Sequence, residues 1–243
     1  MTVAAAATKP VFYPTSDGKP MGETEKHVNA ILDTIQGLRF HLRDRPDAYV
    51  VGNNFVFWEQ GNPKARVSPD TYVVFNVDKT VRDAFYSWKE NDNLPSVVFE
   101  MTSRSTRGED TGKKFQLYEQ VWRTAEYFQF DPSGDYLRPC LQGYRLGPDG
   151  RYARIVEEPD GSLRSEQLDL DLRADGLRLR LYDPVRGRFL PSIGEADDRA
   201  DAEAARAEAQ AERARAAEAE NDRLRAELDT LRRQIGSSGG NTD

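Results

Sequence analysis

An acidic residue lies inside an otherwise apolar run, Val97-Val98-Phe99-Glu100-Met101. A strand that is apolar on both faces is normally buried between two layers of structure. An ionised carboxylate buried there is strongly destabilising unless a metal, a cation or a set of hydrogen-bond donors compensates. Glu100 is therefore a candidate site residue, although a structural ion pair with an arginine would explain the same pattern.

Two more charged residues are placed so that they could complete a site with Glu100. Asp70 follows Pro69 at the entrance to a second apolar run, Tyr72-Val73-Val74-Phe75. Taken alone, this Pro-Asp pair is typical of an ordinary turn. Lys114 follows Glu100 on a predicted helix. Two acids and a lysine on adjacent elements are together the side chains that a metal-dependent phosphodiesterase requires.

The predicted helix carries two neighbouring lysines, and its periodicity separates them. Its inward stripe consists of Phe115, Tyr118, Val121 and Trp122. At about 100° per residue, Lys114 lies roughly 40° from Tyr118, whereas Lys113 lies roughly 140° away and faces solvent. Lys114 is therefore the better candidate. A salt bridge from Lys114 to Asp110, four residues earlier, is a structural alternative that is compatible with this role.

The available ligand types limit the chemistry of such a site. The chain has one cysteine, Cys140, and two histidines, His27 and His41. A closed Cys/His zinc site is therefore almost excluded, and a Ser-His-Asp hydrolase is poorly supported. Carboxylate oxygens without histidine suit Mg²⁺ or Mn²⁺. Such an ion would neutralise phosphate charge and polarise a water, while the lysine would hold that water.

Apolar periodicity predicts the elements that must position these residues. A helix is expected from about Glu23 to Leu42, and a second from the capping-box spacing Thr106-Arg107-Gly108-Glu109 to about Trp122. Strands are expected at 49–51, 55–58, 72–75, 97–101 and 126–130. From 136 to 191, short runs separated by Gly, Pro and Asp predict hairpins added to the core sheet.

Composition divides the chain into four parts. Residues 1–20 predict a flexible N-terminal arm, 21–194 the folded domain, 195–235 a helical coiled-coil tail and 236–243 a disordered end. In the tail, four apolar residues follow one another at intervals of 4, 3 and 4 residues, which is the spacing of a coiled-coil seam. They are Leu224, Leu228, Leu231 and Ile235. We expect a homo-oligomer through 195–235. A solvated single helix is the alternative for its alanine-rich first half.

Charge and hydropathy count against some classes of protein. The net charge is −7, of which 195–243 contributes −5 (13 acidic and 8 basic residues) and the remainder −2 (28 acidic and 26 basic). This gives no domain-wide basic surface for non-specific nucleic-acid binding. No apolar stretch approaches the roughly 20 residues of a membrane span. The single cysteine fits a reducing cytoplasm, which is the expected location.

Short motifs spread over most of the chain match the pattern of one known family. They are Met21-Gly22-Glu23-Thr24 with His27, Gly61-Asn62-Pro63, Ser68-Pro69-Asp70, Glu100, Ser103, Ser105-Thr106, Asp110, Lys114, Tyr118, Glu126-Tyr127-Phe128 and Asp131-Pro132. Through these residues the chain, over roughly 10–235, resembles the Uma-type family of restriction-endonuclease-like proteins in the PD-(D/E)XK nuclease superfamily. Each motif alone is weak, but the combination is specific.

The resemblance implies a fold and a set of roles. The fold would be α/β, with an αβββαβ core, a mixed sheet, added C-terminal hairpins and the long C-terminal helix. Asp70 and Glu100 would be ligands of Mg²⁺ or Mn²⁺, and Lys114 would be the catalytic lysine. Many metal nucleases carry that lysine two residues after the acid, where this chain has Thr102. Glu23 would be an auxiliary catalytic acid.

Two functional hypotheses follow. The first is a metal-dependent endonuclease that hydrolyses phosphodiester bonds in DNA. The second is a catalytically inactive nuclease-fold protein that binds nucleic acid or serves as an assembly module through its helical tail. The intact set of two acids and a lysine favours the first, whereas the near-neutral domain and the long tail favour the second.

Overall fold

The computed structural model describes residues 11–15, 24–103 and 106–238, and for 196, 197, 199 and 234–238 it describes the backbone alone. It divides into two compact units, Met1–Ile193 and Gly194–Asp243. The predicted auxiliary acid Glu23, most of the predicted arm (1–10 and 16–20) and the end of the chain (239–243) lie outside the described residues.

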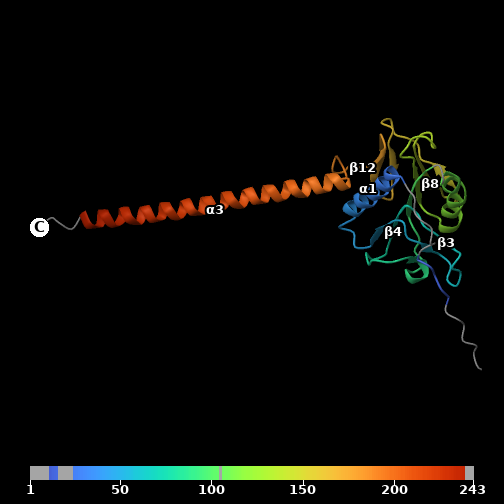
Figure 1. Cartoon of the computed structure of the whole chain (residues 1–243), viewed down its shortest axis with the longest axis horizontal. Coiled ribbons are helices and arrows are strands. Elements are labelled where there is room, and N and C mark those ends of the chain that lie inside the picture. The colour runs from blue at the N-terminus through green and yellow to red at the C-terminus, as the bar shows by residue number, and fades with distance from the viewer. Residues whose placement is uncertain (1–10, 16–23, 104–105, 239–243) are drawn as a thin grey trace, which may run out of the picture. The chain divides into compact units, whose positions relative to one another are not determined.

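A mixed six-stranded sheet forms the centre of the first unit (Figure 1). Its strands are, in spatial order, β1 (Ala48–Val51), β4 (Thr71–Phe75), β6 (Val97–Met101), β7 (Glu126–Phe130), β8 (Leu141–Leu146) and β9 (Tyr152–Arg154). All neighbours are antiparallel except β6 and β7, which are parallel. A parallel pair needs a crossover connection, and the helical segment between β6 and β7 supplies it.

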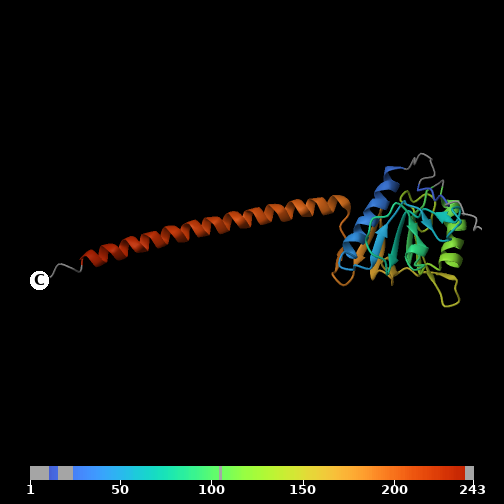
Figure 2. The same ribbon diagram turned by 90° about the horizontal axis from the view of Figure 1, so that it is seen from below.

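Helical segments cover both faces of this sheet, as Figure 2 shows. On one face lies α1 (Glu25–His41), whose N-cap Thr24 accepts a hydrogen bond from the backbone N–H of His27. On the other lies a continuous helical segment made of the π-helical turn η2 (Glu109–Lys113), the short α2 (Lys114–Gln116) and the π-helical turn η3 (Leu117–Trp122). The order α1, β1, β4, β6, helical segment, β7 confirms the αβββαβ core.

The alternation of side chains along β6 divides the core into two clusters. Val97, Phe99 and Met101 pack on the α1 side, whereas Val98 packs with Tyr118 and Tyr127 on the side of the helical segment. Successive residues of a strand point to opposite faces, so Glu100 shares the face of Val98. The carboxylate that interrupts the apolar run therefore points toward the helical segment that carries Lys114.

Two smaller sheets complete the unit. One contains β10 (Leu163–Ser165), β11 (Leu170–Asp175), β12 (Arg178–Asp183) and β13 (Arg188–Phe189), and the other contains β2 (Val56–Phe57), β3 (Arg66–Val67) and β5 (Phe85–Tyr86), followed by the 3₁₀ turn η1 (Ser87–Lys89). The predicted C-terminal hairpins are present. Only the hairpin β8–β9 extends the core sheet, so the prediction that the hairpins are added to that sheet was wrong for the remaining strands. The others form a separate sheet whose leucines share a cluster with α1.

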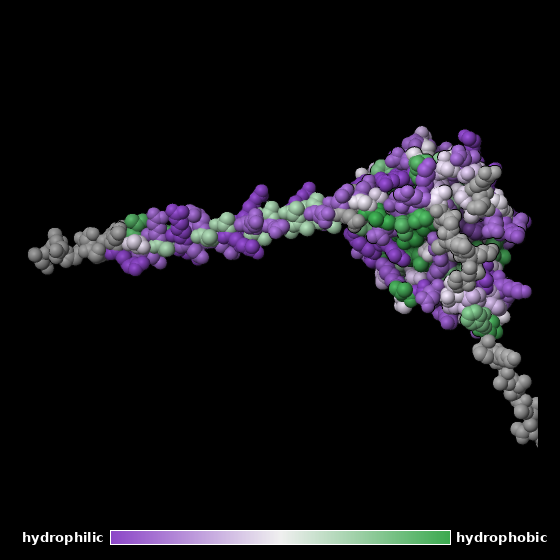
Figure 3. All heavy atoms as spheres, viewed as in Figure 1, coloured by the Kyte–Doolittle hydropathy of each residue, from purple (hydrophilic) through white to green (hydrophobic). Residues whose placement is uncertain are grey.

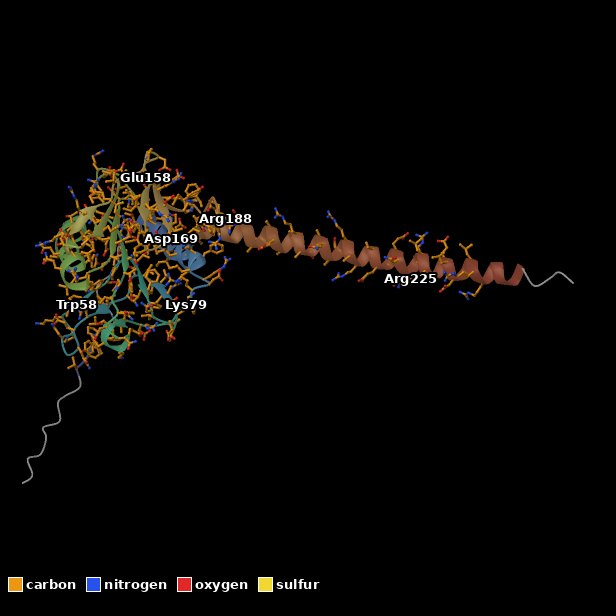
Figure 4. All side chains as sticks on the ribbon, turned by 180° about the vertical axis from the view of Figure 1, so that it is seen from behind. Trp58, Lys79, Glu158, Asp169, Arg188 and Arg225 are labelled. Carbon is orange, nitrogen blue, oxygen red and sulfur yellow. The ribbon has the colours of Figure 1, made fainter. Side chains whose placement is uncertain are left out.

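The second unit consists of one helix, α3 (Ile193–Ser238, 46 residues). Its surface alternates between hydrophilic and weakly apolar stretches, and its side chains, including that of Arg225, project on all sides (Figures 3 and 4). The helical prediction for 195–235 agrees with α3, whereas its pairing into a coiled coil stays a prediction. In the described part of the chain, no helix combines the length and the apolar character that crossing a membrane requires.

Candidate active site

The carboxylate of Asp70 is fixed at the point where β4 begins. Its Oδ2 accepts a hydrogen bond of 2.7 Å from the backbone N–H of Met101, at the end of β6. Nε2 of His27, a buried residue of α1, lies 3.7 Å from the same oxygen. Asp70 therefore joins α1, β4 and β6 at one end of the sheet, next to Glu100.

Glu100 is fully buried, and two side chains of the helical segment contact its carboxylate. Nζ of Lys114 donates to Oε2 at 2.7 Å, and the hydroxyl of Tyr118 donates to Oε1 at 2.6 Å. Among the described residues, the partners of Glu100 are therefore Lys114 and Tyr118 and not the arginine that the structural alternative expected.

Lys114 lies between two carboxylates. Besides Glu100, its Nζ is 3.3 Å from Oδ1 of Asp110, one helical turn earlier, so the expected Lys114–Asp110 ion pair is also present. The Lys114 side chain is 13% exposed, while Lys113 is exposed to solvent. The structure thus brings Glu100 and Lys114 into direct contact and places Asp110 beside them.

Asp110 is held mainly through its backbone. Its carbonyl oxygen accepts hydrogen bonds from the hydroxyl of Tyr127 and from Nε2 of Gln129, at 3.0 and 2.9 Å. Both oxygens of its carboxylate are buried and make no hydrogen bond to any described residue. The carboxylate therefore has the ion pair with Lys114 but unused acceptor capacity, which is unusual for a buried acid.

The charged groups of this cluster shift one another's pKa. Asp70, Glu100 and Asp110 all act on the ammonium of Lys114. Burial, together with the neighbouring Asp70 and Asp110, raises the pKa of Glu100 to about 8, although Lys114 opposes this shift. Burial alone would lower the pKa of Lys114, but the three carboxylates raise it well above its usual range.

The donor set fits a hard divalent cation. The available atoms are carboxylate oxygens, and Mg²⁺ commonly uses one or two protein carboxylates together with water. Among residues 11–15, 24–103 and 106–238, however, no three His, Cys, Asp or Glu side chains form a group that could hold a metal ion. The predicted ligands Asp70 and Glu100 would supply two carboxylates, and the remaining positions around the ion would be left for water or substrate oxygens.

The π-helical turns explain one difference from the predicted helix. Tyr118 and Trp122 are buried as predicted, but Val121 is 52% exposed and Glu119 is buried. A π-helical turn contains more residues than an α-helical one, so positions after it rotate away from a strict 3.6-residue stripe. The prediction that Val121 faces inward was wrong for this reason.

Sequence reasoning assigned no role to Gln129, which lies beside the site. It is fully buried and lies directly opposite Glu100 in the parallel pairing of β6 and β7. The sequence did contain a sign of this position, because Gln129, like Glu100, is a polar residue within an apolar strand. Glu126, on the same strand, shows the contrasting structural case. Its buried carboxylate is satisfied by Arg145, Ser165 and backbone N–H groups.

Comparison with known proteins gives a family match and a distant structural similarity. The family model Uma2, described as "Putative restriction endonuclease", matches residues 15–179. Among solved structures, the chain is similar to a protein from Anabaena variabilis ATCC 29413, titled a putative nuclease belonging to DUF820. The sequences are 14% identical, the TM-score is 0.43, and the match covers 62% of this chain and 76% of that one. No curated protein matches.

Proposed function

Because the chain belongs to the Uma2 family of restriction-endonuclease-like proteins, we propose that it is a metal-dependent endonuclease that hydrolyses phosphodiester bonds in DNA. The observation that carries this proposal is the buried contact between Glu100 and Lys114, with Asp70 and Asp110 beside it. A structural ion pair needs one acid and one base, whereas Lys114 lies between the carboxylates of Glu100 and Asp110.

In this proposal each residue has a separate task. Asp70 and Glu100 hold Mg²⁺ or Mn²⁺, which when bound supplies positive charge for the phosphate and acidifies a water. Lys114 donates a hydrogen bond to the attacking water and stabilises the charge that develops on the phosphate. Tyr118 orients the Glu100 carboxylate through its second oxygen. Glu23 is kept as an auxiliary acid on the strength of the resemblance alone.

The decisive experiment is nicking of supercoiled plasmid DNA with Mg²⁺ or Mn²⁺. We expect Glu100→Ala and Lys114→Ala each to reduce the rate by about 100-fold or more. Lys113→Ala is the matched control, because Lys113 is the exposed neighbour on the same helical segment and its loss should leave the rate unchanged. Activity that survives both site substitutions, or that persists in EDTA, would contradict the proposed site.

Metal binding can be tested separately from cleavage. A bound ion stabilises only the folded state, so Mn²⁺ should raise the thermal midpoint of the wild type. The double variant Asp70→Ala/Glu100→Ala should show no such rise. If the wild type binds metal but nicks no DNA, the alternative function is favoured, in which the fold serves as a catalytically inactive nucleic-acid-binding or assembly module.

The proposal also covers self-association and cellular location. Self-association through 195–235 is supported by the exposed leucines of α3, and a cytoplasmic location by the single, unpaired cysteine Cys140.

A further inference from the structure

The leucines of α3 lie on one stripe of an otherwise polar helix. Leu224, Leu228 and Leu231 are 48%, 53% and 49% exposed, and no described residue covers them. Their spacing assigns Leu224 and Leu231 to the d positions of a heptad and Leu228 to the a position. Leucines at this heptad spacing typically pack against a partner helix. They stabilise the structure only when their apolar surface is buried, which a single exposed helix does not provide.

Charged residues on either side of this stripe are arranged for one particular partner. In the same heptad register, Arg213, Glu220 and Glu227 occupy g positions, and Glu218, Arg225 and Arg232 occupy e positions. In a parallel pair, each g residue lies next to the e residue five positions later on the other helix. The resulting pairs are Arg213 with Glu218, Glu220 with Arg225, and Glu227 with Arg232. All three are attractive.

The residue at the preceding a position is an asparagine. Asn221 lies seven residues before Leu228 and is exposed in α3. A single asparagine at an a position of a parallel coiled coil pairs with its counterpart on the other chain and specifies register and oligomer state, at a cost in stability. Such pairing requires the two Asn221 side chains to meet, which happens only when the chains are in register.

An antiparallel arrangement fits the same residues poorly. If leucines paired with leucines, the two-fold axis that relates the antiparallel helices would lie near Leu228. Arg225 would then face Arg232 of the other chain, and the two Glu227 side chains would lie close together. Like charges at these positions destabilise a coiled coil. Moving this two-fold axis toward the N-terminus of α3 would separate the like charges. It would, however, pair the leucines of one chain with Ala214 and Ala217 of the other.

From this pattern we propose that α3 binds α3 of a second copy of this chain. The two helices form a parallel, in-register, two-stranded coiled coil whose main contacts lie within residues 213–232. The seam N-terminal to this region is alanine-rich, and it adds length but little apolar contact. The pairing is therefore reversible, and both chains enter the coiled coil from the same end. The inference rests on the proposed self-association through 195–235 and is independent of the proposed catalytic activity.

The first test measures the mass of the full-length protein by light scattering over a range of concentrations. We expect a dimer, and we expect Leu224→Ala/Leu228→Ala/Leu231→Ala to raise the dissociation constant by at least about 100-fold. Arg223→Glu is the matched control, because Arg223 occupies the outer c position and its charge lies off the seam. A wild-type monomer at about 100 μM, or a trimer, would overturn the proposal.

Charge variants test the predicted pairs. Glu220→Arg/Glu227→Arg makes the e and g positions from 220 to 232 uniformly basic, and Arg225→Glu/Arg232→Glu makes them uniformly acidic. Each variant alone should be monomeric at low salt, whereas an equimolar mixture should form a heterodimer. Homodimers of unchanged affinity in either variant would show that these residues do not face one another.

A cysteine placed far from the leucines tests the orientation. In a Cys140→Ala background, Ala207→Cys at an a position should form an inter-chain disulfide under mild oxidation, because parallel register places the two sulfurs opposite each other. An antiparallel pair centred on Leu228 would hold them roughly 60 Å apart. Absence of the disulfide in a protein that is dimeric by light scattering would overturn the parallel assignment.

Discussion

At the scale of single residues, Glu100 differs from the other buried acids in how it is satisfied. Glu126 receives hydrogen bonds from an arginine, a hydroxyl and backbone N–H groups, which is the pattern of a structural carboxylate. Glu100 receives one from Lys114 and one from Tyr118, and it lies near two other acids. Its ionisation is therefore unfavourable without further positive charge.

The raised pKa of Glu100 should make the proposed metal binding depend on pH. Below its pKa of about 8 the carboxyl is largely protonated in the metal-free protein, so a metal ion must displace a proton. We expect the apparent affinity for Mn²⁺ to increase from pH 6.5 to about 8 and then to level off. Calorimetry in two buffers of different ionisation enthalpy should detect proton release at pH 7, and Glu100→Gln should abolish it.

A glycine sets the position of Asp70. A Cβ atom added at Gly52 would overlap the backbone carbonyl oxygen of Asp70, so only glycine allows this approach of the two chain segments. We expect Gly52→Ala to lower the free energy of unfolding by about 1–3 kcal/mol, as overpacking does, and to weaken Mn²⁺ binding by displacing Asp70. Urea denaturation and a Mn²⁺ titration would measure the two effects.

The control for this substitution is Gly112→Ala. A Cβ at Gly112, in the helical segment, has open space around it, and alanine is favoured over glycine in a helix. Gly112→Ala should therefore not reduce stability. Equal loss of Mn²⁺ affinity in both variants would show that the contact between Gly52 and Asp70 has no special role.

At the scale of elements, the loop after β7 depends on one ionised side chain. Burial alone would raise the pKa of Asp131, but hydrogen bonds from the Ser133 hydroxyl and from the backbone N–H groups of Tyr136, Leu137 and Ser133 lower it below its usual value. A group with a depressed pKa in the folded state stabilises the protein above its unfolded pKa, and this contribution is lost as the pH falls through the folded value.

Asp131→Asn should therefore lower the free energy of unfolding by about 1–3 kcal/mol at pH 7. The difference from the wild type should shrink as the pH falls below 3.8, the ordinary pKa of an aspartate. Denaturant titrations at several pH values would measure it. The exposed neighbour Asp135 provides the control, and Asp135→Asn should leave stability unchanged at every pH. A constant difference at all pH values would contradict the electrostatic explanation.

Local patterns predicted the elements better than they predicted their pairing. The apolar runs of β4, β6 and β7 and the periodicity of α1 are strong local signals, and each predicted element is present. The separate sheet β10–β13 could not be foreseen, because turn residues indicate where hairpins reverse but not which strands they join. The π-helical turns leave no such signal, because an apolar stripe in a sequence is recognised by its repeat of 3.6 residues per turn.

The candidate site was foreseen only where one strong local rule applied. A charged residue in a buried strand is costly, so Glu100 stood out, and the helical angle then selected Lys114 over Lys113. The position of Asp110 beside the site depends on how the helical segment packs against Gln129 and Tyr127, which no local pattern specifies. The roles of these residues stay predictions until the variants are measured.

At the scale of the whole molecule, the two units should unfold separately. The three tryptophans, Trp58, Trp88 and Trp122, all belong to the first unit, so their fluorescence reports on that unit alone. Far-UV circular dichroism also reports on α3, the longest helix. We expect part of the dichroism transition to shift upward with protein concentration, because pairing stabilises α3, while the fluorescence midpoint stays constant. Concentration dependence of both signals would show that the first unit also takes part in association.

The π-helical turn before Lys114 has a consequence for how such sites can vary. A turn of this kind holds one residue more than ordinary helical geometry requires. Deleting Gly112 would let the segment close into a regular α-helix, and Asp110 and Lys114 would then lie three residues apart instead of four. Residues three or four apart share one face of an α-helix, so Lys114 would still meet Asp110 and Glu100. A related chain could therefore lack this extra residue and keep the same cluster of charges.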